Sequence, residues 1–374
     1  MEQPVIGILG GGQLGRMLVQ KGLDFGLSFR IMDPDISAPC SVFNGFVQGS
    51  ITHFDSVLAF GQDCHIITIE IENVNIEALQ VLQQQGKKIY PQPEAISLIQ
   101  DKRAQKTFYR NNNIPTADFV LTQNREEVSR HTAFLPAVHK LGREGYDGRG
   151  VQIIKTPADL HLAFDAPGVL EKFIPFEKEI AVIAARSAKG EVTTYPPVEM
   201  IFHPEKNLVE YLFAPARISP QTAREADALA RNIIERLQLT GLLAVEMFVT
   251  AKGELLVNEM APRPHNSGHH TIETHITSQF EQHLRAILGW PLGSTALIAP
   301  AAMINLLGED GYSGPAQYKG LEQVLQQPGV HVHLYGKKNT KPFRKMGHVT
   351  VVDEDVARLH RKAEFVKQTL KVIT

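Results

Sequence analysis

The stretch "AVEMFVTAKGELLVNEMAPRPHNSGHHT", residues 244–271, decides the fold and places the site. Up to "NEM" it alternates apolar and polar positions around Lys252-Gly253, which is typical of a β-hairpin with a two-residue loop. In that register Glu246 lies opposite Glu259, so two carboxylates share one face, roughly 5 Å apart, and repel each other. A cation between them would remove the repulsion, and hard oxygen ligands suit Mg²⁺. The pattern therefore predicts a magnesium site on a hairpin.

Two alternatives to this interpretation remain open. A slip of one residue in the register would place the two glutamates on opposite faces, and one of them could instead face solvent or pair with Arg263. The loop that follows carries His265, His269 and His270, which could suggest a transition-metal site. No cysteine lies nearby and two of the histidines are adjacent, so we expect an anion-binding loop beside the magnesium instead.

The segment "HKLGREGYDGRGV", residues 139–151, is a second feature that points to phosphate chemistry. It lacks the Gly-Lys-Ser/Thr ending of a Walker loop. Its glycines cost backbone entropy, and an ordinary surface turn would rarely need so many of them. The segment is therefore interpreted as a mobile flap that closes over a polyphosphate. Lys140, on the strand before the flap, would clamp a phosphate, and Tyr146, Asp147 and Arg149 would move with the flap. The alternative is an ordinary flexible polar loop.

A glycine motif opens the chain. "GILGGGQLGR" contains G-x-G-x-x-G at Gly10, Gly12 and Gly15, after a strand and at the start of a helix. Asp33 and Asp35 stand where an acid on a nucleotide ribose would be expected. Free amides and the dipole at such a helix start favour an anion, so a phosphate ligand is predicted and NAD is one candidate.

Composition narrows the class of protein. The chain has 374 residues, 43% of them hydrophobic, which is enough for two or three domains. A net charge of −2 argues against a nucleic-acid or anionic-membrane partner. We find no apolar run of about 18 residues, and no signal sequence before the first strand, so a cytoplasmic protein is expected. Cys40 and Cys64 are interpreted as small buried hydrophobic residues.

The order of strand-like and helix-like segments predicts three parts. Residues 1–95 alternate strands and helices, which indicates a parallel α/β sheet of Rossmann-like type. Residues 96–296 hold the flap, within a subdomain at about 118–175, and the glutamate hairpin. Residues 297–374 are expected to form a small β-rich module that ends in a helix.

Flap, lysines and glutamate hairpin, in this order, resemble the ATP-grasp superfamily. The chain also contains the strings "GILGGGQLGRM", "EIENV", "GYDGRG", "NEMAPRPHNSGHHT" and "YGK…FRKMGH". Together they closely resemble the 5-(carboxyamino)imidazole ribonucleotide synthetase family of purine biosynthesis, over essentially the whole chain. That resemblance implies a ligase that phosphorylates bicarbonate with ATP to carboxyphosphate and carboxylates the amine of aminoimidazole ribonucleotide. It leaves open whether free CO₂ meets the amine, and it implies Mg²⁺ (or Mn²⁺) and a homodimer.

The resemblance also assigns site residues. Those on the ATP side are Lys102, Lys140, Gly145, Tyr146, Asp147, Gly148, Arg149, Gly150, Val151, Glu171, Lys172, Phe173, Ile174, Glu179, His203, Asn258 and Glu259. Those on the ribonucleotide and bicarbonate side are Gly12, Gln13, Leu14, Glu72, His265, Asn266, Ser267, Lys337, Arg344 and Lys345. The catalytic candidates are Asp147, which would accept the amine proton, Tyr146, Arg149, Arg263 and His265, and the metal ligands are Glu246 and Glu259.

Four positions depart from the patterns of related enzymes. Lys102 stands where an arginine is common, Glu72 lies in the altered string "ITIEIEN", and His270 replaces a position that is often aromatic. Ala261 stands where many other ATP-grasp enzymes have asparagine. Competing hypotheses are another ATP-grasp carboxylate–amine ligase, an NAD-dependent dehydrogenase built on the N-terminal glycine turn, and a regulatory nucleotide-binding protein with a decayed site.

Overall fold

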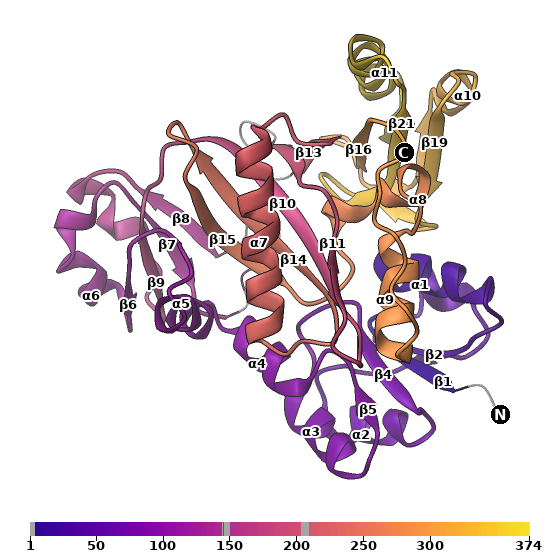
Figure 1. Cartoon of the computed structure of the whole chain (residues 1–374), viewed down its shortest axis with the longest axis horizontal. Coiled ribbons are helices and arrows are strands. Elements are labelled where there is room, and N and C mark those ends of the chain that lie inside the picture. Colours follow the sequence, from indigo (N-terminus) through magenta and orange to yellow (C-terminus); the bar gives the residue numbers. More distant parts are fainter. Residues whose placement is uncertain (1–3, 144, 146–149, 203–208) are drawn as a thin grey trace.

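The computed structural model describes residues 4–143, 145, 150–202 and 209–374. Its elements gather in three groups around one long central sheet, as Figure 1 shows. The mixed α/β class expected from the sequence is confirmed, with a parallel sheet at the N-terminus. The predicted domain boundaries stay a prediction.

The N-terminal group is a parallel sheet in the order β3-β2-β1-β4-β5. Its strands are β1 (Val5–Leu9), β2 (Ser28–Asp33), β3 (Phe46–Gln48), β4 (Ile66–Ile69) and β5 (Lys88–Ile89). Helices α1 (Gln13–Leu23), α2 (Phe54–Gln62) and α3 (Ile76–Gln84) connect them. The central strand β1 reads as a short apolar run because both of its faces are covered, and Ile6, Ile8 and Leu9 are fully buried.

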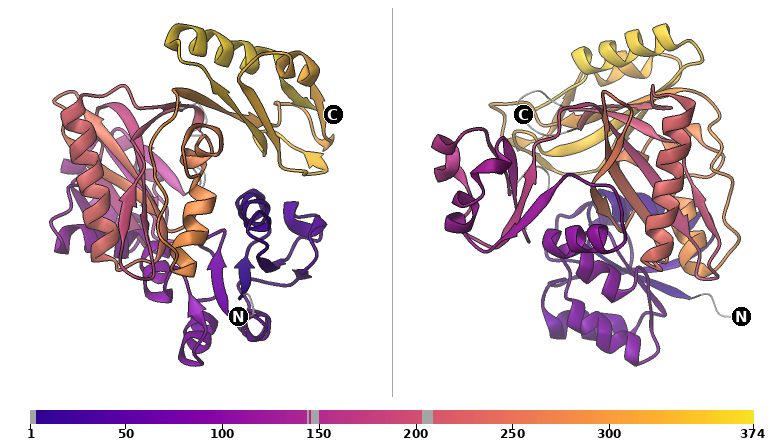
Figure 2. Two further views of the ribbon diagram at one scale, coloured as in Figure 1. Left: turned by 45° about the vertical axis from the view of Figure 1, so that its right-hand side comes forward. Right: turned by 60° about the vertical axis from the view of Figure 1, so that its left-hand side comes forward.

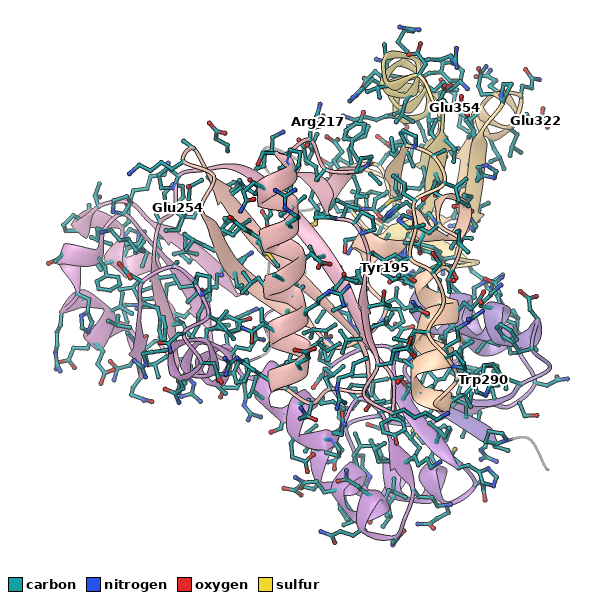
Figure 3. All side chains as sticks on the ribbon, in the orientation of Figure 1. Tyr195, Arg217, Glu254, Trp290, Glu322 and Glu354 are labelled. Atoms are coloured by element: carbon teal, nitrogen blue, oxygen red, sulfur yellow. The ribbon has the colours of Figure 1, made fainter. Side chains whose placement is uncertain are left out.

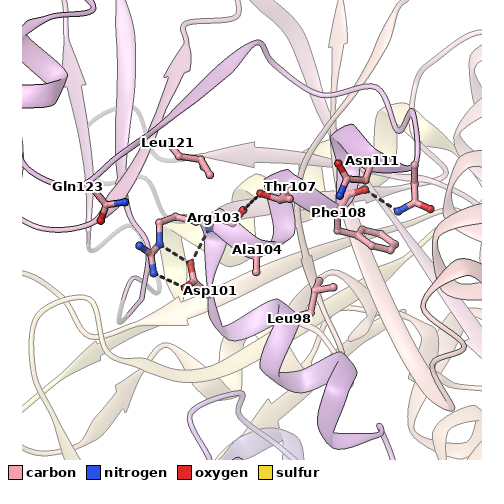
Figure 4. A pocket seen from close by; sticks show the side chains of 10 residues that line it. Leu98, Asp101, Arg103, Ala104, Thr107, Phe108, Asn111, Leu121 and Gln123 are labelled. Atoms are coloured by element: carbon pink, nitrogen blue, oxygen red, sulfur yellow. Dashed lines mark hydrogen bonds and ion pairs between the residues drawn. The ribbon is translucent and has the colours of Figure 1, made fainter.

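Two helices lead from this sheet to the next group. Helix α4 (Pro93–Gln100) ends at Asp101, whose side chain accepts a hydrogen bond from the backbone of Arg103 and so caps α5 (Lys102–Asn111). Figure 4 shows the Arg103 guanidinium reaching back to the same carboxylate, at 3.1 and 2.8 Å. On this side of α5 lies a pocket of about 450 Å³, lined by Arg103, Ala104, Thr107 and Phe108 among others. Lys102, the first residue of the same helix, contacts Glu259 in the site described below.

The flap subdomain is an antiparallel sheet in the order β6-β9-β7-β8. Its strands are β6 (Phe119–Thr122), β7 (Ala137–Leu141), β8 (Val151–Ile154) and β9 (Gly168–Lys172), with α6 (Arg125–Ser129) alongside. Strands β7 and β8 flank the glycine-rich segment, and Lys140 pairs with Val151 across it. The flap is therefore carried by two hydrogen-bonded strands.

The central sheet runs without interruption into the C-terminal module. Its order is β15-β14-β10-β12-β13-β16-β21-β19. The strands are β10 (Phe176–Arg186), β12 (Val198–Phe202), β13 (Val209–Ala214), β14 (Gly241–Thr250), β15 (Leu255–Ala261), β16 (Ala301–Leu307), β19 (Val330–Leu334) and β21 (Lys345–Val352). Helix α7 (Pro220–Arg236) lies in front of the sheet in Figure 1 and packs on β10 and β14. Helix α9 (Gln279–Leu288) packs on the same two strands. Helix α11 (Val356–Thr369) covers β16 and β21.

The N-terminal and C-terminal groups face each other beside the central sheet, as the left view of Figure 2 shows. Trp290, labelled in Figure 3 just after α9, lies against Phe25 with ring centroids 5.4 Å apart and ties the central part to the N-terminal sheet. Cys40 and Cys64 are free and buried, which confirms their interpretation as core residues. In the described part of the chain, no helix has the length and apolarity needed to span a membrane.

Candidate active site

The glutamate hairpin has the predicted pairing but reaches it by another route. Glu246 lies opposite Glu259, whereas Met247 pairs with Val257, so Asn258 is an extra residue that bulges between two register segments. The expected two-residue loop is wrong: Thr250 donates to the backbone oxygen of Glu254, which leaves three residues in the turn. The longer loop alone would have put the glutamates on opposite faces. The bulge at Asn258 restores them to one face.

Three carboxylates converge beside this hairpin, and their electrostatic states differ. The ammonium of Lys102, 2.7 Å from Glu259, lowers the pKa of that carboxyl to about 2. Burial raises the pKa of Glu246 well above its usual range, and the charges of Glu259 and Glu179 raise it further. Burial together with Glu259 also raises the pKa of Glu179 to about 7. Ionisation of Glu246 and Glu179 is therefore unfavourable unless a positive charge comes close to these three carboxylates.

Two predicted phosphate lysines approach the carboxylates from different elements. Lys102, at the start of α5, binds Glu259, and its backbone amide donates to the carbonyl of Gly142 at 2.7 Å. Lys140, on β7, donates to the side-chain oxygen of Asn258 at 2.8 Å. Asn258 in turn donates to Glu179 at 3.2 Å. Both lysines therefore lie at the glutamate hairpin, where their ammonium groups are held by Glu259 and Asn258.

Glu171 has a role that the sequence did not reveal. Its carboxylate, 4% exposed, lies 3.2 Å from the ammonium of Lys140 and 3.0 Å from that of Lys106. Burial would raise the pKa of Glu171, but Lys140 and Lys106 together lower it, so the group stays ionised. The next residues use their amides inside the flap subdomain: Lys172 donates to Asp118 and Phe173 to Pro136.

Several flap residues and one nucleotide-side residue fall outside the described part of the chain. They are Tyr146, Asp147, Gly148, Arg149 and His203. Their assigned roles stay predictions. Gly145, Gly150 and Val151 are described, and Gly150 has a φ of +72°, a backbone conformation that favours glycine.

His265, the first histidine of the loop after the hairpin, lies close to Glu246. His265 Nε2 lies 3.6 Å from Glu246, and its Nδ1 is 2.8 Å from the hydroxyl of Ser267. Asn266 donates to Asn305 on β16 at 2.8 Å. Arg263 lies 2.9 Å from Glu72 of the N-terminal part, which brings the predicted bicarbonate residues next to a predicted ribonucleotide residue.

The other two histidines of the loop turn into the interior. His269 stacks on His348 with centroids 4.6 Å apart, and His270 lies edge-on to His275 at 5.1 Å. Burial lowers the pKa of His269 and His270 well below the usual range, so both are neutral. Within the described ranges, no group of three or more His, Cys, Asp or Glu side chains is arranged to hold a metal ion.

The N-terminal glycine turn is filled by the chain itself. Gly15 donates its amide to Glu70 at 3.0 Å, and Gly11 donates to Asp33 at 2.7 Å. A Cβ on Gly12 would lie 2.3 Å from the Glu70 carboxylate, so a side chain there would displace that carboxylate. A carboxylate, Glu70, lies at the start of α1, which the sequence analysis did not foresee, and the predicted phosphate ligand stays a prediction. Glu70 competes for the amides that a dinucleotide would need.

Basic residues of the C-terminal module meet this turn. The ammonium of Lys337 donates to the carbonyl of Lys345 at 2.7 Å, and Arg344 donates to the carbonyl of Asn339 at 2.7 Å. A Cβ on Gly336 would lie 2.9 Å from the Arg16 guanidinium of α1, so the two parts touch here. Hydrogen bonds from Ser37 lower the pKa of Asp35, and Arg344 lowers it further.

A flap between two strands, a pair of lysines and a carboxylate pair on a hairpin define an ATP-grasp enzyme. Family models agree along the chain. A "Ribonucleotide synthetase preATP-grasp domain" matches residues 3–100, an "ATP-grasp domain" residues 107–280, and a "Phosphoribosylaminoimidazole carboxylase C-terminal domain" residues 301–362.

Known proteins resemble the chain over its whole length. The N5-carboxyaminoimidazole ribonucleotide synthase of Synechococcus elongatus is 38% identical, with 92% of this chain and 89% of that one covered. The phosphoribosylaminoimidazole carboxylase of Ogataea methanolica is also 38% identical, and this chain spans 71% of its length; a similar carboxylase of Vigna aconitifolia is spanned over 66%. The N5-carboxyaminoimidazole ribonucleotide synthetase of Thermotoga maritima has a TM-score of 0.91 at 42% identity, with both chains fully covered. The enzyme of Aspergillus clavatus in complex with ADP and 5-aminoimidazole ribonucleotide has a TM-score of 0.89 at 32% identity, with 98% of each chain covered.

The chain belongs to the N5-carboxyaminoimidazole ribonucleotide synthetase family. It is an ATP-grasp ligase. The resemblance inferred from the sequence is therefore confirmed.

Proposed function

We propose that the protein carboxylates 5-aminoimidazole ribonucleotide with bicarbonate and ATP, giving N5-carboxyaminoimidazole ribonucleotide, ADP and phosphate in purine biosynthesis. A bicarbonate oxygen attacks the γ-phosphorus and ADP leaves. The carboxyphosphate then transfers its carboxyl carbon to the exocyclic amine, the amine loses a proton, and phosphate departs. The observation that carries this proposal is the meeting of Glu246, Glu259, His265 and the Arg263–Glu72 pair between two binding regions.

On the ATP side, the lysines are proposed to hold phosphates. Lys102 and Lys140 present ammonium groups beside Glu259 and Asn258, and phosphate oxygens would exchange with these protein partners. Glu179 is proposed for the ribose hydroxyls, and the segment from Glu171 to Ile174 for adenine. Gly145, Gly150 and Val151 flank the flap that would cover the phosphates.

A magnesium ion, or manganese, fits the donor set of the hairpin. Glu246 and Glu259 face each other, and the carboxyl of Glu246 has a raised pKa that a divalent charge would bring down. When bound, such an ion neutralises charge on the β- and γ-phosphates. The ammonium of Lys102 contacts Glu259, and the bulge at Asn258 places the Glu259 carboxylate on the same face of the hairpin as Glu246.

The second substrate is proposed to lie between the glycine turn and the C-terminal basic residues. Lys337, Arg344 and Lys345 would bind the ribonucleotide phosphate, for which the guanidinium fork is suited. Gly12 to Leu14 and Glu72 would contact the same molecule. On the bicarbonate side, His265, Asn266, Ser267 and Arg263 would orient the anion. Asp147 would accept the amine proton, with Tyr146 and Arg149 positioning the reacting groups.

Three further points belong to the proposal. The partners are the small-molecule substrates ATP, bicarbonate and aminoimidazole ribonucleotide. A homodimer and a cytoplasmic location are proposed on the resemblance to the family. A net charge of −2 supports the expectation that nucleic acid is not a partner.

The test is ADP release from purified protein with Mg·ATP, with bicarbonate and ribonucleotide supplied together, singly or not at all. Release that requires both would support the proposal. Release that ignores the ribonucleotide would retain an ATP-grasp ligase but reject this acceptor. NAD binding without any ADP release would reject the proposal entirely.

A further inference from the structure

One buried lysine beside the nucleotide pocket has no assigned role. Lys106 lies on α5, four residues and about one turn after Lys102, so the two ammonium groups emerge from the same face. The side chain of Lys106 is only 3% exposed. A charge in such a place is costly unless it is paired and hydrogen-bonded.

The ammonium of Lys106 is held by groups from separate elements. It lies 3.0 Å from Glu171 Oε2, on β9, and donates to the hydroxyl of Thr116 at 2.6 Å. Thr116 donates onward to the carbonyl of Val257 at 2.6 Å, on the hairpin strand that carries Glu259. Lys106 therefore connects the flap subdomain to the glutamate hairpin.

Glu171 is shared between this lysine and a phosphate lysine. Its other oxygen, Oε1, lies 3.2 Å from the ammonium of Lys140. If Lys140 turns to a phosphate, Glu171 loses one partner while its carboxylate stays buried. A buried charge that loses its partner is strongly destabilised. Moving Lys140 to a phosphate therefore costs less free energy if a second cation stays beside Glu171 than if none does.

We infer that Lys106 is a positioning residue for the nucleotide: it is the permanent counter-ion of Glu171, and it thereby leaves Lys140 able to bind a phosphate. Without Lys106, the buried carboxylate of Glu171 retains Lys140 and withholds its charge from ATP. This inference rests on the proposed function, because that proposal assigns Lys140 to the phosphates.

The electrostatics of Lys106 fit a role in binding better than a role in stability. Burial lowers its pKa to about 8, Glu171 on β9 opposes the shift, and Lys140 on β7 and Lys102 on α5 add to it. The Tyr109 ring on α5, at 5.7 Å, and the Thr116 hydroxyl complete its surroundings among the described residues. The charged form is thus disfavoured in the folded protein relative to water, so the charge of Lys106 does not by itself add to stability, although its removal would leave the buried Glu171 with one cation fewer.

The experiment measures the Kd for Mg·ATP by calorimetry, without bicarbonate or ribonucleotide, together with the melting temperature. Lys106→Met should raise the Kd at least about tenfold, and its melting temperature shows whether the variant is folded. Lys106→Arg, which keeps the charge, should remain within about threefold of the wild type. Arg110→Met removes an exposed charge from the same helix and should change neither quantity.

A double variant separates positioning from a general disturbance. In Glu171→Gln the carboxylate that lies 3.2 Å from Lys140 is gone, so adding Lys106→Met to it should change the Kd by less than about threefold. An unchanged Kd in Lys106→Met would overturn the inference, whatever happens to the melting temperature. If that single variant does not fold, a large difference between Glu171→Gln and the double variant would overturn it equally. Wild-type protein that binds ATP but never releases ADP would count against the proposed function alone.

Discussion

The two proposed binding regions hold their cations in different ways. On the nucleotide side, Lys102 and Lys140 lie against the carboxylates Glu259 and Glu171. On the ribonucleotide side, Lys337 and Arg344 donate to backbone carbonyl groups of the C-terminal module. A phosphate that enters the first region must replace an ionic partner, whereas one that enters the second meets Arg344, which donates to a carbonyl oxygen and has the charge of Asp35 nearby.

This difference predicts different responses to mutation. Charges in the nucleotide region form one network, so substitutions there should be non-additive and should affect ATP first. Substitutions in the ribonucleotide region should act on that substrate alone. The following predictions test this contrast, from the largest expected effect to the smallest.

The largest effect is expected at the glutamate hairpin. Glu259→Gln removes a carboxylate from the pair and should reduce ATP turnover at least about a hundredfold, because metal stabilisation of phosphate charge is worth several kcal/mol. The measurement is ADP release at saturating substrates. Glu254→Gln, at the exposed tip of the same hairpin in Figure 3, makes the same chemical change and should behave like the wild type. Normal turnover in Glu259→Gln would show that the hairpin does not serve the nucleotide.

A smaller and more selective effect is expected at Arg344. Arg344→Ala removes a charged donor to phosphate, and the KM for the ribonucleotide should rise by about tenfold to a hundredfold. The Kd for Mg·ATP should not change. Lys341→Ala, an exposed lysine in the same loop, is the control. An equal loss in ATP binding would mean that the two regions are not separate.

The pH response should also divide the regions. The pKa of Lys106 is lowered to about 8, so its charge is present below that pH and is lost as the pH rises through it. Above about pH 8 Lys106 becomes neutral, and Glu171 would then hold Lys140 more strongly. Affinity for ATP should therefore fall, by about tenfold near pH 9. Calorimetric titrations at several pH values would show this, and Lys106→Arg should flatten the profile. A flat wild-type profile would argue against the exchange.

The smallest effect is expected at Lys102, where related enzymes commonly have arginine. Lys102→Arg keeps the positive charge beside Glu259, so the KM for ATP should change by no more than about threefold. Steady-state kinetics would suffice. A hundredfold loss would instead show that the compact ammonium is required at its 2.7 Å contact with Glu259.

Much of the fold was predictable because it depends on local patterns. Short apolar runs separated by amphipathic helices indicated the parallel sheet, whose central strand β1 is buried on both faces. The pairing of Glu246 with Glu259 was also predicted, but two errors cancelled. The turn is one residue longer than expected, and the bulge at Asn258 compensates. Neither feature has a distinctive local pattern.

The contacts that were missed join residues far apart in the chain. Nothing in one sequence indicates that Lys106 pairs with Glu171, since many lysines and glutamates could be partners. The glycine turn predicted a phosphate ligand at the start of α1, and the structure shows a carboxylate of the chain itself there. That this carboxylate is Glu70, which follows another strand, depends on how β1 and β4 lie side by side. Local signals therefore place the elements, and the buried charge network appears only in three dimensions.

The most direct test of the account uses bicarbonate labelled with ¹⁸O. If ATP phosphorylates bicarbonate, the oxygen that attacks the γ-phosphorus stays with phosphate when the carboxyl group passes to the amine. In the presence of the ribonucleotide, each phosphate released should therefore carry one oxygen from bicarbonate, as mass spectrometry of the phosphate would show. Phosphate without label, formed alongside carboxylated ribonucleotide, would contradict the account.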